Sequence, residues 1–330
     1  MKRVTIYDVA NEAKVSLATV SRVINGLEIV REDTRQRVEA AIEKLGYKPN
    51  AIAQGLALQK TTTIALVVPE ASFVNTGQVI NGLMDVAKIY KYNIMLHTTT
   101  EGINEIEDIV ENIIKSRVDG VVIFNDQVVA EEVTQLNKYQ FPIVLIGNKL
   151  HHDSLSSVYV DIEKAVFELA TSVLEKDPTV RIGVVEDRKN QHSSQLLVQG
   201  VTRAYQGINK SSLPFIPIPA DYRSSYDYIS KHINELDFNY FITYRDSQAL
   251  AVRNSVIEAG KRIPEDVEIV CVLDSKYNSM VRPKLSSFSI PSYDLGAVAM
   301  RIMTKMLHDE EVSESEIELS YLYTPRQSTK

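Results

Sequence analysis

A short segment near the N-terminus carries the side chains best suited to reading nucleic acid. In residues 5–25, TIYDVANEAKVSLATVSRVIN, apolar residues recur with the spacing of two short helices separated by a tight break. Ser16 predicts the N-cap of the second helix, because a serine hydroxyl accepts from the free N–H groups of the first turn. Leu17, Ala18, Ser21 and Arg22 lie opposite the apolar face. A small, mildly apolar face with one cation suits the DNA major groove, where arginine pairs with guanine and apolar groups meet thymine methyls. The alternative is an ordinary helical hairpin packed on a core.

A second group of chemically capable residues lies near the C-terminus. Asp294, Arg301 and Lys305 are spaced i, i+7 and i+11 in a helical pattern whose other positions are largely apolar. A helix face with two cations can receive a phosphoryl group or an acidic partner. The alternative is a solvated face whose charges form their own ion pair.

The residues do not indicate enzymatic chemistry. No glycine-rich phosphate-binding loop follows a strand-like run. The histidines lack metal-ligand spacing, apart from the adjacent His151 and His152 in a polar segment. Cys271, the single cysteine, lies in the apolar run VEIVCVLD and is expected to be a small core residue. We therefore expect no enzyme, no metal and no cofactor, and a reducing, cytoplasmic location.

The composition describes an ordinary globular protein with unevenly distributed charge. The 330 residues, 44% hydrophobic and 24% charged, suffice for two or three domains. No apolar run is long enough to cross a bilayer and no signal peptide is visible, so we expect no membrane partner. Residues 1–60 hold ten Lys and Arg against seven Asp and Glu, whereas residues 61–330 hold 26 against 36. This asymmetry assigns any polyanion site to the first sixty residues.

The elements that must position these residues follow from periodicity. A third helix is predicted over residues 32–45, ended by Gly46 and barred from continuing by Pro49. Residues 50–58, NAIAQGLAL, permit a helix but are too short to form one alone, so we expect them to order only on a partner. Apolar residues there either dock on the rest of the protein or insert into a bound molecule.

From residue 61 onward, strand-like and helical patterns alternate. Nine apolar runs are expected to form strands, at residues 64–69, 92–97, 120–125, 141–147, 157–162, 181–186, 215–219, 240–244 and 267–273. Apolar strands separated by helices predict parallel sheets covered on both faces, and their number favours two α/β subdomains. We expect the chain to cross between them at residues 160–162 and again at residues 287–291.

Two motifs resemble the LacI family of bacterial transcription regulators: TIYDVANEAKVSLATVSRVING and the following YKPNAIAQGLA. The resemblance covers the whole chain and is densest at residues 4–67 and 279–308. Within the family, the segments KTTTIALVVP, IYKYNI, PSYDLGAVAMRIMTK and RQSTK are most similar to the catabolite-control members of Gram-positive bacteria. The resemblance implies an α/β fold: a three-helix helix-turn-helix head on a periplasmic-binding-protein-like core of two doubly wound parallel-sheet subdomains.

The resemblance also implies the domain limits and the DNA contacts. The head is expected at 1–48, the hinge at 49–60, one subdomain at 61–160 plus 291–322, and the other at 161–290 plus 323–330. In the family the hinge folds on operator DNA and inserts an apolar wedge, here Leu56, into the minor groove. The full set of implied DNA-binding residues is Thr5, Ser16, Leu17, Ala18, Thr19, Ser21, Arg22, Asn25, Thr34, Tyr47, Asn50, Ala53, Gln54, Leu56 and Ala57. Pairing of two heads implies a homodimer on a pseudo-palindromic operator.

The regulatory partner implied by the resemblance is a protein. Catabolite-control members bind serine-phosphorylated HPr as corepressor, which would here contact Asp85, Ile89, Tyr90, Tyr293, Asp294, Arg301 and Lys305.

The signal for a small effector is weaker. Asp246 and Asp274 match acidic cleft positions, but Leu197 replaces the arginine that sugar-sensing members place three residues before Gly200. A repressor controlled by a sugar or sugar phosphate is therefore the alternative, with a sugar phosphate also a candidate adjunct effector. A sugar-binding or enzymatic protein whose first helices serve only assembly is disfavoured by the charge asymmetry.

Overall fold

Two compact units, Met1–Thr62 and Thr63–Lys330, make up the chain, each with its own hydrophobic core. The computed structural model describes residues 4–27, 29–48, 61–68, 74–98, 105–124, 138, 141–147, 149, 155–187, 191–208, 215–218 and 221–330. Among these residues, no helix combines the length and the apolar character that crossing a membrane requires.

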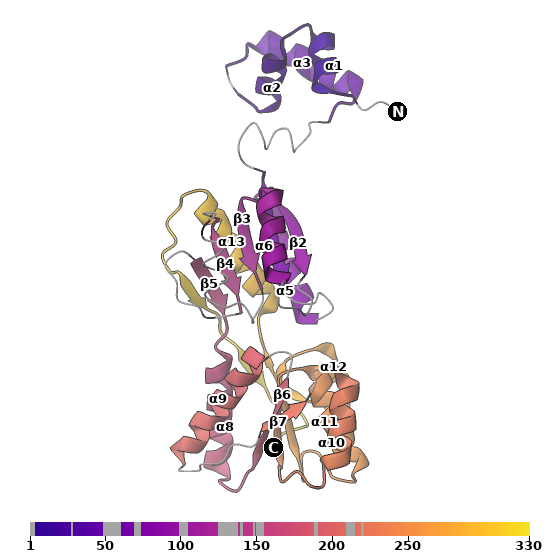
Figure 1. Ribbon diagram of the computed structural model, residues 1–330, viewed down its shortest axis with the longest axis vertical. Helices are drawn as coiled ribbons and strands as arrows, with labels where there is room; N and C mark the ends of the chain where they lie inside the picture. Colours follow the sequence, from indigo (N-terminus) through magenta and orange to yellow (C-terminus); the bar gives the residue numbers. More distant parts are fainter. Residues whose placement is uncertain are drawn as a thin grey trace. The chain divides into compact units, whose positions relative to one another are not determined.

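The first unit is a three-helix head, as predicted. Its helices are α1 (Ile6–Ala13), α2 (Leu17–Ile24) and α3 (Glu32–Leu45) (Figure 1). Val9, Val20 and Val38, one from each helix, are fully buried at the centre of its core. Gly46 ends α3 at a φ of 61°, which favours glycine because it has no Cβ.

The second unit contains two sheets with six described strands each. In the first sheet all neighbouring strands are parallel, in the order β11-β5-β4-β3-β1-β2. Its strands are β1 (Thr63–Val68), β2 (Asn93–Thr98), β3 (Gly120–Ile123), β4 (Ile143–Ile146), β5 (Leu155–Tyr159) and β11 (Glu316–Glu318).

The second sheet has the order β12-β10-β9-β8-β6-β7, in which β12 alone is antiparallel to its neighbour. Its strands are β6 (Ile182–Asp187), β7 (Phe215–Ile218), β8 (Tyr240–Thr243), β9 (Glu268–Leu273), β10 (Ser286–Ser289) and β12 (Leu322–Thr324). Two parallel-sheet subdomains behind a helical head confirm the predicted fold class.

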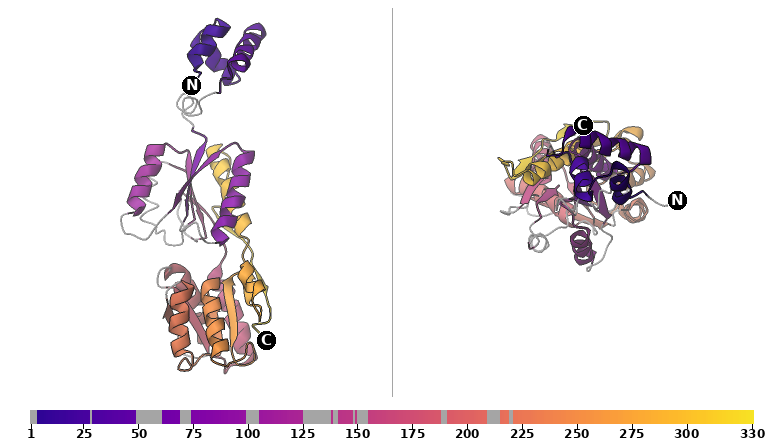
Figure 2. Two further views of the ribbon diagram at one scale, coloured as in Figure 1. Left: turned by 90° about the vertical axis from the view of Figure 1, so that its right-hand side faces the viewer. Right: turned by 90° about the horizontal axis from the view of Figure 1, so that it is seen from above.

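Helices cover both faces of each sheet because the strands are apolar on both sides. Along β1, Leu66 packs with α5 (Val74–Ile89) and α13 (Ser292–Leu307), whereas Ala65 packs with α6 (Glu105–Ser116). Figure 2 shows these helices on opposite sides of the sheet. The second sheet lies between α8 (Ile162–Lys176) with α9 (Gln191–Gly207), and α10 (Tyr222–His232) with α11 (Asp246–Glu258). A short helix, α12 (Lys276–Met280), follows β9.

The chain crosses back to the first subdomain within the predicted residues 287–291, because β10 of the second sheet ends at Ser289 and α13, which packs on the first sheet, begins at Ser292. The first part of that segment was not predicted to be a strand, yet Ser286–Ser289 forms β10. Ser286 and Ser287 are fully buried despite their polar side chains. The Ser286 N–H donates to Ser328 Oγ at 2.8 Å, and its hydroxyl shares a hydrogen bond of 2.8 Å with Thr329 Oγ1. These partners come from the C-terminal tail, so local hydropathy does not reveal the strand.

The predicted strand at residues 157–162 is displaced. The observed strand, β5, ends at Tyr159, and Asp161 starts α8 by accepting from the Lys164 N–H at 2.9 Å. The chain does leave the first sheet at residues 160–162, as predicted, since the next strand is β6 of the second sheet. The strands β11 and β12 were not predicted because three residues are too few for a periodic signal.

We expect Val38→Ala to destabilise the head by about 2 kcal/mol, because it removes buried methyl groups from a small core. Hydrogen exchange of head amides in the full chain measures the loss. Ile29→Ala is the control, since Ile29 is 80% exposed and its loss is expected to change stability by no more than about 0.5 kcal/mol. Equal effects of the two substitutions would contradict this account of the core.

Candidate nucleic-acid interface and partner surface

Helix α2 presents the side chains predicted to read DNA. Ser16 caps the helix: its Oγ accepts from the Thr19 N–H at 3.2 Å and lies 2.9 Å from Thr19 Oγ1. The inward face is buried, while Leu17, Ala18 and Arg22 are exposed. No acceptor or carboxylate among the described residues pairs with the Arg22 guanidinium. An exposed cation free of internal partners is available to a base edge or a phosphate.

The other predicted head residues surround this helix. Thr5 caps α1, with its N–H and hydroxyl both donating to Asp8 Oδ2, at 2.8 and 2.7 Å. Asn25 follows α2 and donates to Ser21 Oγ at 3.4 Å. Thr34 lies in the first turn of α3, and Tyr47 packs half-buried against the head core.

Two head features were missed by the sequence reasoning. Thr5 and Asp8 form a capping box, for which the spacing of a threonine and an acid three residues apart was an available signal. The turn between α2 and α3 exposes the large apolar side chains of Leu27 and Ile29, for which periodicity gives no signal because they lie outside the helices. The predicted hinge residues Asn50, Ala53, Gln54, Leu56 and Ala57 lie outside the described residues.

The core brings the second predicted group together across a large gap in sequence. Asp85 and Ile89 lie on α5 with Tyr90 just beyond it, and Tyr293 lies on the adjacent α13. The Tyr293 hydroxyl donates to Asp85 Oδ2 at 2.9 Å. This hydrogen bond is the first cause, ahead of burial, of a pKa for Tyr293 above its ordinary value. Residues 208 positions apart therefore form one surface.

This α5/α13 surface combines apolar area with free cations. Ile89 is 74% exposed and Tyr90 44% exposed. Arg301 is exposed and Lys305 half-exposed on α13, and within the described part of the chain neither has a carboxylate at ion-pair distance. The alternative of a face neutralised by its own Asp294–Arg301 pair is therefore not the observed arrangement. The exposed Asp294 lies in the first turn of α13, where its negative charge interacts favourably with the helix dipole.

The two acidic residues assigned to an effector cleft follow neighbouring strands of the second sheet. Asp246 begins α11 after β8, and Asp274 follows β9. Asp274 Oδ2 accepts from Arg326 Nη2 at 2.8 Å, in a mostly buried ion pair. Arg326 also donates to the Leu285 carbonyl at 2.7 Å and to Ser287 Oγ. The Asp274 carboxylate is thus already used to anchor the C-terminal tail.

Leu197, which stands where sugar-sensing members have an arginine, also does not offer a ligand contact. It is fully buried within the apolar cluster that includes Val184 and Val201. Arg326 was missed by the sequence reasoning, because nothing local connects it to a carboxylate 52 residues earlier.

The single cysteine, Cys271, is buried. Burial raises the pKa of the Cys271 thiol to about 12, so it carries no thiolate near neutral pH. The described residues contain no cluster of three His, Cys, Asp or Glu side chains placed to hold a metal. His151 and His152 lie outside the described residues.

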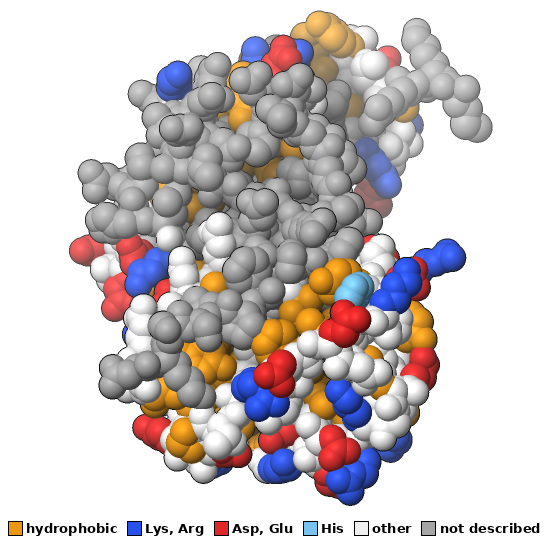
Figure 3. Space-filling model, turned by 60° about the horizontal axis from the view of Figure 1, so that its bottom comes forward, with side chains coloured by type: hydrophobic (Ala, Val, Ile, Leu, Met, Phe, Trp, Pro, Cys, Tyr) orange, Lys and Arg blue, Asp and Glu red, His pale blue; other side chains and the backbone are white. Residues whose placement is uncertain are grey.

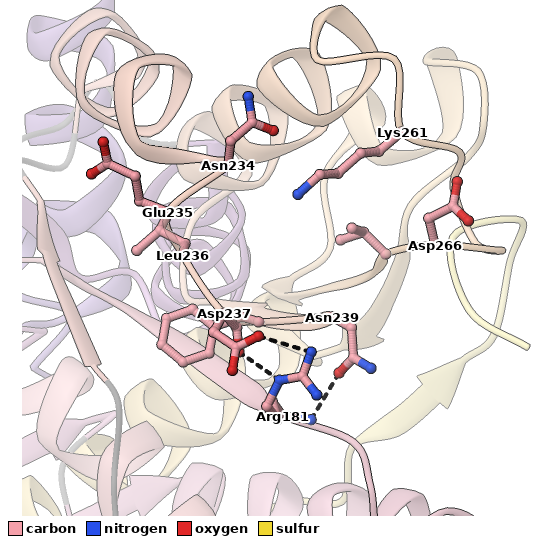
Figure 4. Close-up of a pocket in the computed structure, with 10 residues that line it drawn as sticks. Arg181, Asn234, Glu235, Leu236, Asp237, Asn239, Lys261 and Asp266 are labelled. Carbon is pink, nitrogen blue, oxygen red and sulfur yellow. Dashed lines mark hydrogen bonds and ion pairs between the residues drawn. The ribbon is translucent and has the colours of Figure 1, made fainter.

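A pocket of about 480 Å³ lies at the amino ends of β6, β8 and β9 (Figure 4). Apart from Glu235, its charged groups already have partners: Arg181 contacts Asp237 at 3.0 Å, Lys261 donates to the Ile233 carbonyl, and Asp266 binds Arg262 outside the pocket. Charges of both signs are also interspersed over this end of the core (Figure 3). This end of the molecule therefore lacks the single-sign field that attracts a polyanion.

Two family models match the chain. The model of the bacterial regulatory proteins of the lacI family matches residues 5–50, and that of the periplasmic binding protein-like domain matches residues 179–329. Catabolite control protein A of Priestia megaterium is 36% identical over 336 residues, which cover 99% of both chains. The HTH-type transcriptional regulator pepR1 of Lactobacillus delbrueckii subsp. lactis is 33% identical over 326 residues, covering 99% of this chain and 98% of its own.

Solved structures agree on the fold. The lac repressor dimer bound to operator and the anti-inducer ONPF gives a TM-score of 0.86 at 21% identity, covering 99% of both chains. CcpA of Lactococcus lactis gives a TM-score of 0.72 at 24% identity, covering 81% of this chain and 99% of its own.

These matches define the class of protein. The chain belongs to the LacI family and is a DNA-binding transcription regulator. Among its relatives are catabolite control proteins A of Gram-positive bacteria, at 32% to 36% identity over nearly the full length.

We expect Arg326→Met to reduce the free energy of unfolding by about 2 kcal/mol, because it leaves the mostly buried Asp274 carboxylate unpaired. Urea unfolding of the full chain measures the change. Adding Asp274→Asn to this variant removes the orphaned charge and should recover part of the loss. A double variant no more stable than Arg326→Met would show that the ion pair is not the source of the effect.

Proposed function

We propose that this regulator acts in carbon catabolite control in the cytoplasm. It binds a pseudo-palindromic operator as a homodimer, and serine-phosphorylated HPr raises its DNA affinity. The observation that carries the proposal is the α5/α13 surface, where free cations lie beside exposed apolar and aromatic side chains. The names of its relatives, catabolite control protein A among them, support the same assignment.

The proposed DNA contacts divide into specifying and positioning groups. Arg22 would contact guanine, and Leu17 and Ala18 would meet thymine methyl groups, because these are the exposed side chains of α2. Hydroxyl and amide groups around them, including Thr34 and Asn25, suit phosphate oxygens. The hinge residues would enter the minor groove, with Leu56 as the wedge.

A dimer follows from the length of DNA that one head covers. A single helix-turn-helix head reads one half-site, and specific affinity requires two. Large apolar side chains on the core support an interface between copies: Met84 on α5, Leu96 on β2 and Met280 on α12 are exposed. Isolated exposed apolar groups are common, but several on one core offer area that a second copy would bury.

The chemistry of the α5/α13 surface matches a phosphorylated protein better than a small ligand. Arg301 and Lys305 can form charge-assisted hydrogen bonds to phosphate oxygens. Ile89 and Tyr90 add an apolar contact that a free sugar phosphate would not fill. The cleft acid Asp274 is held by Arg326 and Leu197 is buried, which weakens the alternative of a sugar effector.

We also propose the domain limits given above. The position of β11 in the first sheet and of β12 in the second supports a return of the chain between subdomains near residue 322.

We expect operator affinity to fall steeply with salt, and Arg22→Ala to weaken specific binding by roughly 1–3 kcal/mol. Arg37→Ala is the matched control, because it removes the same charge from the exposed side of α3. Titrations against operator and scrambled DNA should show that both variants lose non-specific affinity equally. Only Arg22→Ala should lose the preference for operator; if both keep it, α2 does not read bases as proposed.

We expect Arg301→Ala to abolish the gain in operator affinity produced by serine-phosphorylated HPr while leaving affinity without HPr unchanged. The reason is that Arg301 lies on the core surface, where its side chain has no partner among the residues that the structure describes. Arg223→Ala, at an exposed arginine on α10, is the control, and unphosphorylated HPr tests the need for the phosphate. An undiminished gain in Arg301→Ala, or an equal response to sugar phosphates, would favour the small-effector alternative.

A further inference from the structure

Two glycines bring the backbones of α5 and α13 into direct contact. A methyl group on Gly82 of α5 would lie 1.9 Å from the Tyr293 carbonyl oxygen and 3.1 Å from the Ala297 nitrogen. A methyl group on Gly296 of α13 would lie 2.0 Å from the Val79 carbonyl oxygen and 2.9 Å from the Leu83 nitrogen. Both contacts are far shorter than van der Waals distance and involve backbone atoms, which cannot rotate away. No side chain fits at either position at the observed helix spacing.

The same contact sets the geometry of the surface above it. Tyr293, whose carbonyl faces Gly82, donates its hydroxyl to Asp85, less than one turn further along α5. Gly82 on α5 and Gly296 on α13 therefore allow the close approach of the two helices within the same short part of their interface. Beneath it, Leu83 and Ala299 are fully buried in the core, so the helices cannot rotate without disturbing the first sheet.

A partner that uses this surface must contact both helices. The exposed apolar group, Ile89 with Tyr90, belongs to α5 or its end, whereas the free cations Arg301 and Lys305 belong to α13. The distance between the two groups is fixed by how closely the helices pack, and side chains at the contact determine that spacing. An alanine in place of either glycine requires about 1.5 Å of extra separation to reach ordinary contact.

We propose that Gly82 and Gly296 are positioning residues for the protein-binding surface. They hold apolar groups of α5 and cations of α13 at the spacing that one phosphorylated protein partner engages at once. Neither glycine touches the partner. This inference rests on the proposed function. It gives two residues without side chains a role in binding the protein partner.

The test compares Gly82→Ala and Gly296→Ala with Gly77→Ala in the full chain. Gly77 lies on the same helix α5, and a methyl group there meets nothing within 4 Å. Binding of serine-phosphorylated HPr and of operator DNA is measured for each variant, together with thermal unfolding. We expect the Gly82 and Gly296 variants to bind phosphorylated HPr at least tenfold more weakly, with operator affinity in its absence within twofold of the parent. Gly77→Ala should match the parent in both.

The outcomes separate the inference from the function on which it rests. If the parent binds phosphorylated HPr and the folded Gly82 and Gly296 variants bind it equally well, the positioning role is wrong and the proposed function stands. If the parent does not bind it, both are wrong. Hydrogen exchange on the parent protein provides a second test that does not depend on whether the variants fold. Phosphorylated HPr should protect amides of both α5 and α13, and protection confined to α13 would overturn the proposal.

Discussion

Burial of both faces of the two parallel sheets is the constraint on which the rest of the core depends. Residues of β1 alternate between two separate apolar clusters, one under α5 and α13 and one under α6. Because neither face of such a sheet can remain in water, the long helices of the core pack their apolar sides against the strands. The outer sides of those helices are what is left for partners. The α5/α13 surface is therefore a by-product of covering the first sheet, and its position is fixed by the same packing.

Most of this architecture is readable from the sequence, because it is recorded in local periodicity. The three head helices follow from the spacing of residues such as Val9, Val20 and Val38, and the cap at Ser16 from its residue type. The nine apolar runs correspond to strands β1 to β9, which leaves β10, β11 and β12 unpredicted. What local patterns do not record is a polar residue satisfied from far away: Ser286 is buried in a strand because Ser328 and Thr329 bond to it.

Local sequence patterns also do not show which charged side chains of the candidate sites are paired in the fold. The spacing around Arg22 and Arg301 places them on helix faces that could bind a partner, whereas nothing in the sequence near Arg326 shows that it pairs with a distant carboxylate. Among the described residues, the first two side chains have no internal partner, whereas the third holds Asp274 at 2.8 Å. A charged side chain is available for recognition only when the fold does not consume it. This distinction explains why Asp274, a reasonable ligand in sequence terms, acts here as an anchor.

The two proposed sites also differ in how much of the fold each one needs. The reading face of α2 is organised within a few residues, by Ser16 and by packing on two neighbouring helices of the same head. The α5/α13 surface joins Asp85 to Tyr293 across 208 residues and exists only when strands, helices and both glycine contacts are in place. Local unfolding of either helix would remove the α5/α13 surface, since such segments unfold in cooperative units. If the proposed function holds, the protein partner is bound only by an intact core, whereas the shape of the proposed DNA-reading helix is set within the head.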